Sequence, residues 1–188
     1  LYHSGQMTKA EQACRKLLQT YPQSLIVLNV LGAALAGQGQ LQPAVQVFDQ
    51  IIRLRPGLAE AYNDRGIALK GLGQPEAAVA SYNKAIQLKP DLAEVYSNRG
   101  NALHDLGQLV EAVDSCNRAI QIQPDFAEAY SNRGNSLRDL GQLEEAVTSY
   151  DQAIQLKPDL AEVYSNRGNI LRDLGQLEEA VTSYDQAI

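Results

Sequence analysis

The stretch AEVYSNRGNALHDLGQLVEAVDSCNRAIQIQP, residues 93–124, contains two amphipathic helical patterns joined by a glycine. Apolar residues of the first pattern, from about residue 93 to 106, recur at helical spacing, and Gly107 then interrupts them. The second pattern runs from about residue 109 to 122, and Pro124 prevents it from continuing. The stretch therefore predicts a helix, a tight turn and a second helix.

The same pattern recurs every 34 residues, with a Gly-Gln pair at the turn and a proline at the end of each unit. The glycines of the pairs are Gly5, Gly39, Gly73, Gly107, Gly141 and Gly175, and the prolines are Pro22, Pro56, Pro90, Pro124 and Pro158. Ala127–Ile154 and Ala161–Ile188 align over 28 positions and differ at two, which leaves 26 identities. We predict one array over 1–188, with a partial repeat at 1–24, full repeats at 25–58, 59–92, 93–126 and 127–160, and a truncated repeat at 161–188.

Two short helices cannot bury an apolar face by themselves, whereas stacked pairs cover one another. The sequence therefore predicts an all-α fold, an α-solenoid in which stacked antiparallel helix pairs form a right-handed superhelix. Asp91, Asp125 and Asp159 precede the first helices, each three residues before a glutamate. This spacing predicts capping boxes, with the aspartates as N-caps.

The repeat resembles the tetratricopeptide repeat in its length and in its order of large, small and proline residues. Tyr62, Tyr96, Tyr130 and Tyr164 occupy the large slot of the first helix, and Ala44, Ala78, Ala112, Ala146 and Ala180 occupy the small slot of the second. The resemblance implies a non-catalytic scaffold that binds an extended peptide of another protein in a concave groove lined by the first helices. The sequence departs from the family at Arg65, Arg99, Arg133 and Arg167, where Leu31 keeps the usual residue, and it assigns these arginines no role.

Composition argues against two classes of partner. The net charge is −6 and no run of lysine and arginine is present, which argues against nucleic-acid binding. The apolar stretches are far shorter than the roughly 20 residues that span a bilayer, so we expect no membrane insertion. Two cysteines in separate repeats favour a reducing compartment such as the cytoplasm, although the localisation itself is not determined.

No catalytic residue, metal ligand or cofactor motif is expected. Cys14 and Cys116 fall in a core slot that otherwise holds phenylalanine or tyrosine, and stacked repeats would keep them too far apart for a disulfide. His3 and His104 lack other ligands at metal-binding spacing. The glycines all belong to the repeat rather than to a phosphate-binding loop.

The strongest candidates for peptide binding are asparagines of the first helices. One row consists of Asn98, Asn132 and Asn166, preceded by Asp64, and a second row consists of Asn101, Asn135 and Asn169. Each carboxamide offers two donors and an acceptor, which match a peptide N–H and C=O. The first row resembles the asparagine ladder in the tetratricopeptide arrays of O-GlcNAc transferases. The alternative is that these amides bond the local backbone or only hydrate the surface.

The first helices of the N-terminal repeats have a different character. Ile26, Val30, Ala33 and Ile67 occupy positions that are polar in later repeats. We expect them to form a small apolar pocket for one side chain of a bound peptide. The alternative is that residues preceding this sequence cover them.

The last helical pattern presents Leu177, Val181, Tyr184 and Ala187 without a following repeat to cover them. We expect either a longer parent protein or head-to-tail self-association through this end. Two other functions stay open beside the peptide-binding scaffold. One is the substrate-recognition array of a larger glycosyltransferase, and the other is a self-assembling structural array.

Overall fold

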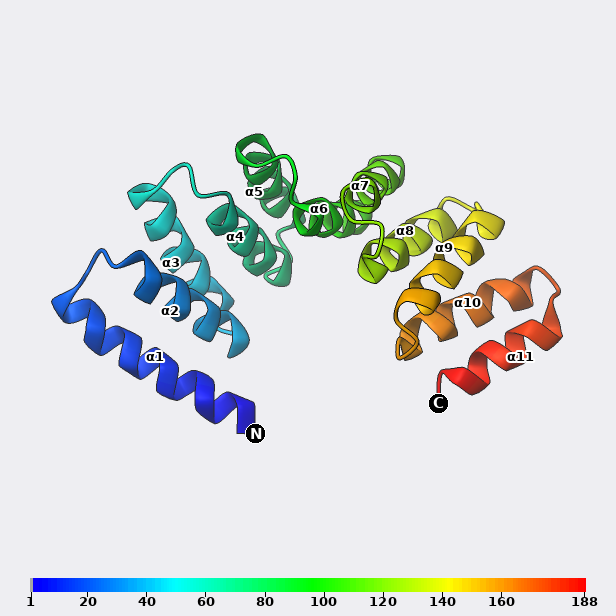
Figure 1. Ribbon diagram of the computed structural model, residues 1–188, viewed down its shortest axis with the longest axis horizontal. Helices are drawn as coiled ribbons and strands as arrows, with labels where there is room; N and C mark the ends of the chain where they lie inside the picture. Colours follow the sequence, from blue (N-terminus) through cyan, green and yellow to red (C-terminus); the bar gives the residue numbers. More distant parts are fainter. Residues whose placement is uncertain (1) are drawn as a thin grey trace. The chain divides into compact units, whose positions relative to one another are not determined.

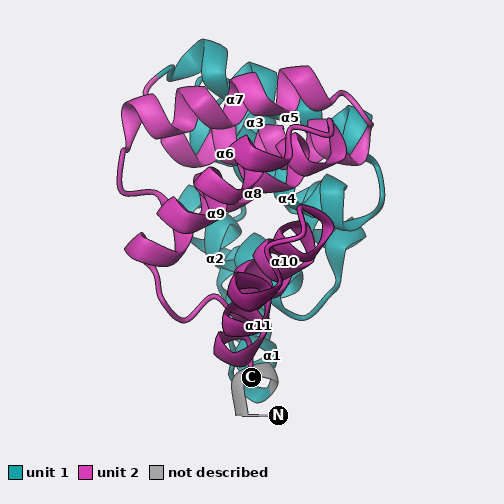
Figure 2. Ribbon diagram, turned by 90° about the vertical axis from the view of Figure 1, so that its right-hand side faces the viewer, with its two compact units in different colours: residues 1–90 teal, residues 91–188 magenta. Residues whose placement is uncertain are grey.

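The computed structural model describes residues 2–188, with side chains from residue 5 onward. This part of the chain contains helices and no strands, and it divides into two compact units, unit 1 (residues 1–90) and unit 2 (residues 91–188) (Figure 2). The prediction of an all-α solenoid is confirmed, while the division into individual repeats stays a prediction.

Unit 1 is built from helix pairs that follow one another along the chain (Figure 1). Its helices are α1 (Tyr2–Thr20), α2 (Leu25–Gly37), α3 (Leu41–Leu54), α4 (Ala59–Gly71) and α5 (Pro75–Leu88). Each helix packs against the next, and α2 also contacts α4. We call α2 and α4 the first helices of their pairs, and α1, α3 and α5 second helices.

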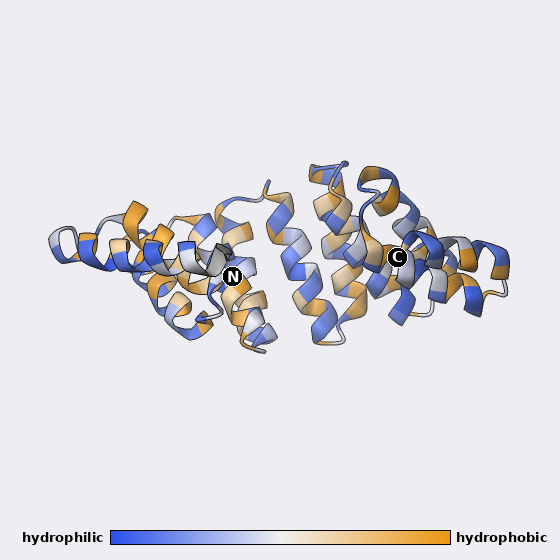
Figure 3. Cartoon of the chain, turned by 90° about the horizontal axis from the view of Figure 1, so that it is seen from below, coloured by the Kyte–Doolittle hydropathy of each residue, from blue (hydrophilic) through white to orange (hydrophobic). Residues whose placement is uncertain are grey.

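Unit 2 repeats the same arrangement. Its helices are α6 (Ala93–Asp105), α7 (Leu109–Ile122), α8 (Ala127–Asp139), α9 (Leu143–Leu156), α10 (Ala161–Asp173) and α11 (Leu177–Gln186). The first helices α6, α8 and α10 contact each other in order. The second helices α7 and α9 each pack between the helices before and after them, and α11 packs against α10. Hydrophobic and hydrophilic residues alternate along the helices of both units (Figure 3).

The core of each pair rests on one close approach between its two helices. A Cβ atom at Gly134 would lie 2.5 Å from the Cε1 of Tyr150, whose side chain is fully buried. Gly66 has the same relation to Tyr82 in unit 1. Because a contact this short is sterically forbidden, only glycine lets the two helices approach this closely. The turn between the helices also needs glycine, since Gly107 has φ of 71°.

Two details of the predicted helices are wrong. The N-cap of α6 is Leu92 rather than Asp91, and no side chain caps the helix. The same shift occurs at α10, where Leu160 packs against the core and thereby places Asp159 one residue before the N-cap. The other error concerns Gly5, because α1 continues through this glycine without a turn.

Candidate functional site

The first-helix side of unit 2 contains a hollow of about 420 Å³. Asn101 of α6 and both Asn132 and Asn135 of α8 line it. The remaining lining residues are Ala127, Glu128, Ser131, Lys157, Leu160, Glu162 and Val163. The structure therefore brings three of the six predicted asparagines into one hollow, which we call the asparagine hollow. The other three do not line it.

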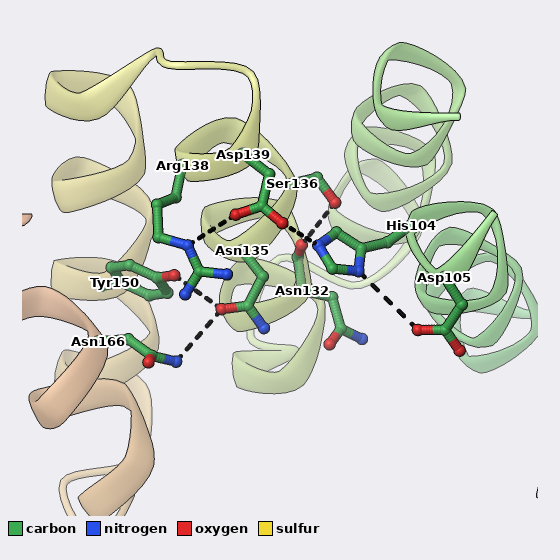
Figure 4. A network of polar contacts seen from close by, with 9 residues as sticks. All are labelled: His104, Asp105, Asn132, Asn135, Ser136, Arg138, Asp139, Tyr150 and Asn166. Atoms are coloured by element: carbon green, nitrogen blue, oxygen red, sulfur yellow. Dashed lines mark hydrogen bonds and ion pairs between the residues drawn. The ribbon is translucent and has the colours of Figure 1, made fainter. Parts of the chain in front are cut away.

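The hydrogen bonds of the first row connect neighbouring pairs. The Nδ2 of Asn132 donates to the Oγ of Ser97 over 3.0 Å. The Nδ2 of Asn166 donates to the Oδ1 of Asn135 over 3.3 Å (Figure 4). Asn98 and Asp64 also have interaction partners. One side-chain N–H of Asn132 thus connects α8 to α6, and the side-chain Oδ1 of Asn132 stays available as an acceptor.

The second row has a structural role that the sequence did not reveal. The hydroxyl of Tyr150 donates to the Oδ1 of Asn135 over 2.7 Å, and that of Tyr184 donates to the Oδ1 of Asn169 over 2.9 Å. The phenol of Tyr150 is fully buried and that of Tyr184 is half-buried, so each bond satisfies a hydroxyl that has lost water. Burial is the main cause that raises the pKa of Tyr150 to about 12. The fifteen-residue spacing between Asn and Tyr was the signal in the sequence.

Asn101 is the exception in this row. Cys116 takes the place of the tyrosine fifteen residues later, so no phenol reaches the Asn101 amide. Within residues 5–188 we find no hydrogen-bond partner for this side chain, which is partly buried in the wall of the asparagine hollow. Its two donors and its acceptor are therefore free for a ligand.

Charged side chains flank the asparagines of α6 and α8. The Nε2 of His104 lies 2.9 Å from Asp139, and the Nε of Arg138 donates to the same carboxylate over 2.8 Å (Figure 4). These contacts hold the pKa of the Asp139 carboxyl below its usual value, with the Arg138 hydrogen bond as the largest cause. His104 therefore links the two neighbouring first helices α6 and α8.

The predicted apolar pocket of unit 1 is an exposed patch on α2 and α4. Ile26 is 79% exposed, Val30 47% and Ile67 44%, and Ala33 is exposed as well. Helix α1 packs against α2 and leaves these side chains uncovered. We call this set the apolar patch.

The four arginines that depart from the family pattern clamp consecutive helix pairs. Each donates to a serine sixteen residues later in its own pair: Arg65 to Ser81, Arg99 to Ser115, Arg133 to Ser149 and Arg167 to Ser183. The serines are buried, and Arg133 and Arg167 also bond the second helix of the preceding pair. The Nε of Arg65 lies 2.8 Å from the Oδ1 of Asp49 in the preceding pair. The two groups form an ion pair, but they are not aligned for a hydrogen bond. The sequence held a signal for this clamp, since Leu31 is followed sixteen residues later by Val47 instead of serine.

Both cysteines are buried and free. Burial raises the pKa of the Cys116 thiol to about 12 and also raises the pKa of Cys14. In residues 5–188 no group of three His, Cys, Asp or Glu side chains could hold a metal ion. No helix in the described chain is long and apolar enough to cross a membrane.

Comparisons with protein families agree with this architecture. Models described as "TPR repeat" match residues 71–107 and 134–171, and models described as "Tetratricopeptide repeat" match residues 1–59, 93–126, 115–148 and 161–188. A search of curated protein sequences found no match.

Solved structures with the same fold include several such proteins. MamA is 25% identical with a TM-score of 0.75, and the match covers 84% of this chain and 92% of MamA. YrrB, described as a TPR protein with an unusual peptide-binding site, is 22% identical with a TM-score of 0.71, covering 95% of this chain and 92% of YrrB. PilF of Pseudomonas aeruginosa is 18% identical with a TM-score of 0.78, covering 96% of this chain and 76% of PilF.

Proposed function

The chain belongs to the tetratricopeptide repeat family of protein-interaction scaffolds, and we propose that it binds an extended peptide segment of a partner protein along its first helices. The observation that carries this proposal is the asparagine hollow, in which Asn101 presents an amide without a hydrogen-bond partner among residues 5–188. An extended peptide has alternating N–H and C=O groups that need such a donor and acceptor when they leave water.

The side chains of the hollow suit a peptide backbone better than a charged ligand. Asn101 offers two N–H donors and an oxygen, and Asn132 keeps its Oδ1 after donating to Ser97. Lys157 and the carboxylates of Glu128 and Glu162 lie in the same lining, so it carries both signs of charge, with one more negative than positive group. Contacts to the backbone would make the hollow tolerant of different peptide sequences.

The apolar patch supplies the second half of the proposal. Three large aliphatic side chains that stay exposed after folding can bury an apolar side chain of the ligand. We propose that this patch of unit 1 anchors an apolar side chain of a bound peptide, while the asparagine hollow of unit 2 binds a peptide backbone.

The test uses peptides selected from a random library against the immobilised protein. Calorimetry then measures the dissociation constants of the wild type, Asn101→Ala, Asn132→Ala and the control Gln152→Ala on the exposed face of α9. We expect each asparagine variant to bind about tenfold more weakly, because each loses a hydrogen bond to the ligand. Gln152→Ala should bind like the wild type.

Stability separates a loss of binding from a loss of structure. Asn101→Ala removes no hydrogen bond that the described residues make, so its free energy of unfolding should equal that of the wild type. Asn132→Ala loses the bond to Ser97, which should lower the free energy of unfolding by about 1 kcal/mol. Equal affinity of Asn101→Ala and Gln152→Ala would show that the peptide lies elsewhere. Loss of affinity in all three variants would point to a general effect on folding.

Self-association is a second proposed role, carried by one observation at α11. Leu177 and Val181 are 62% and 57% exposed, while the equivalent Leu143 and Val147 pack against the core of unit 2. We propose that the exposed face binds a helix pair of another copy. Sedimentation should show a concentration-dependent dimer for the wild type and a monomer for Val181→Lys. If the wild type is also a monomer, this role is excluded. The recognition array of a larger glycosyltransferase and the exclusion of nucleic acid stay predictions.

A further inference from the structure

The clamps of Arg133 and Arg167 in unit 2 differ in one partner, and the difference leaves the charge of Arg133 without a counter-ion among the described residues. Arg167 bonds Ser183 and forms an ion pair with Asp151 of the preceding pair. Arg133 has the equivalent serine, Ser149, at 3.0 Å. The position equivalent to Asp151 holds Asn117, whose neutral Oδ1 accepts from Arg133 over 3.1 Å.

The Arg133 guanidinium is partly buried, and its contacts within the described chain are all with neutral groups. It donates to Ser149 and Asn117, and it stacks on the ring of Tyr130 at 5.2 Å from the centroid. No carboxylate of residues 5–188 lies within ion-pairing distance of it. Burial lowers the pKa of this arginine, as expected for a cation that has lost water without gaining a counter-ion.

A pocket of about 280 Å³ lies against this cation. Arg133 and Leu137 of α8 line it together with residues of α7 and α9, which are Val113, Asn117, Glu145, Thr148 and Ser149. Arg133 is the one cation among these described residues. The pocket shares no residue with the asparagine hollow, and it combines apolar walls with a planar group of N–H donors.

We propose that this pocket binds the carboxylate of an acidic side chain of a partner protein. The guanidinium has five N–H donors. The bonds to Ser149 and Asn117 use two of them, and the other donors can bind a ligand. A carboxylate would supply here the counter-ion that Asp151 supplies to Arg167. Val113 and Leu137 would contact the methylene groups of an aspartate or glutamate. Glu145 adds one negative charge to the lining, which disfavours a doubly charged phosphate more than a singly charged carboxylate.

This site goes beyond the proposed peptide binding, because it lies between the second helices α7 and α9. A partner that supplies an acidic side chain here would contact a different side of α8 from a peptide in the asparagine hollow. The two sites can therefore be tested separately.

The probe is acetyl-glutamate amide, which carries its only carboxylate on the side chain. Two-dimensional NMR of the arginine Nε–Hε groups follows the titration, and the Arg133 signal is assigned by its loss in Arg133→Lys. We expect a saturable shift of this signal, with a dissociation constant on the order of 1–10 mM for a single charge-assisted contact. Acetyl-glutamine amide, which has no charge, should leave the signal unchanged.

Two exchanges between the clamps test the reason for binding. Asn117→Asp places a carboxylate beside Arg133 and should weaken the binding of the probe at least tenfold. Asp151→Asn removes the counter-ion of Arg167 and should create a second site, with a saturable shift of the Arg167 signal. Each change introduces a residue that another repeat already has at the equivalent position. The NMR spectra also report whether each variant is folded.

Three outcomes would overturn the proposal. They are an unmoved Arg133 signal in the wild type, an equal shift in Asn117→Asp, and an equal shift by the glutamine amide. Inorganic phosphate serves as a further arm of the titration. Tighter binding of phosphate than of the glutamate amide would assign the pocket to a phosphate group and would contradict the choice of an acidic side chain.

Discussion

The exposed slots of the first helices carry different residues in unit 1 and in unit 2. In α2 these slots hold Ile26, Val30 and Ala33, which are exposed and apolar. In α4 the third slot stays apolar with Ile67, while the first two hold Glu60 and Asp64. In α6 and α8 the corresponding slots hold glutamates and asparagines, and Asn101 and Asn132 line a polar hollow. One repeated core thus carries two kinds of surface.

The comparison shows which positions the fold constrains. Ala44 in unit 1 and Ala112 in unit 2 are both completely buried, and the glycine facing the aromatic core slot is present in both units. Packing two helices at this distance leaves room for no larger residue. The exposed slots carry no such constraint, so they can vary with the ligand.

The largest expected effect is on the alkylation rates of the two buried thiols, Cys116 in unit 2 and Cys14 in unit 1. At pH 8 a thiol with a pKa of about 12 is thiolate on the order of once in ten thousand molecules, compared with roughly one in four for a free cysteine. Alkylation of Cys116 by iodoacetamide should therefore be on the order of a thousandfold slower in the folded than in the urea-unfolded protein. Mass spectrometry of the peptides measures both rates.

Cys14 sharpens this prediction because it lies in α1, a second helix at the edge of unit 1, with 5% of its surface exposed. Local opening of a terminal helix is easier than that of an internal one, so Cys14 should react faster than Cys116. Equal rates for the two thiols would mean that the units open together.

The second prediction tests whether the two units share one packing constraint. Gly66→Ala in unit 1 and Gly134→Ala in unit 2 each place a methyl group 2.5 Å from a buried tyrosine ring. Each substitution should lower the free energy of unfolding by about 1–3 kcal/mol, as overpacking does. Urea denaturation measures the change.

The control is Gly57→Ala, because a Cβ at Gly57 meets nothing within 4 Å and its φ is not positive. This variant should change the free energy of unfolding by less than about 0.5 kcal/mol. A large loss in only one of the two tyrosine-facing variants would show that the cores of the units differ after all.

The smallest effect concerns the difference between the two surfaces. Ile67→Asn gives α4 the residue of the equivalent slot in unit 2 and should weaken binding of a selected peptide about fivefold, because one half-exposed aliphatic contact is lost. Val110→Asn is the matched control, since Val110 is 60% exposed on the second helix α7. If both variants bind as tightly as the wild type, the apolar patch does not contact the peptide.

The helix pairs and their core could be predicted from the sequence. Helical periodicity, the 34-residue step and the small residues at Gly100 and Ala112 are local or strictly periodic features, and burial follows directly from them. The capping boxes could not be predicted correctly, because packing of Leu160 against the core decides where α10 begins.

The sequence by itself determined which residues each slot contains, and the tertiary structure decided which of them meet. Asn132 bonds Ser97, a residue 35 positions earlier, and Arg133 bonds both Asn117 and Ser149, each sixteen positions away. Whether an amide or a guanidinium is already satisfied depends on such partners from other helices. The folded chain therefore distinguishes Asn101 from Asn135, and Arg133 from Arg167, by their partners on other helices, although each pair has the same residue in the same slot.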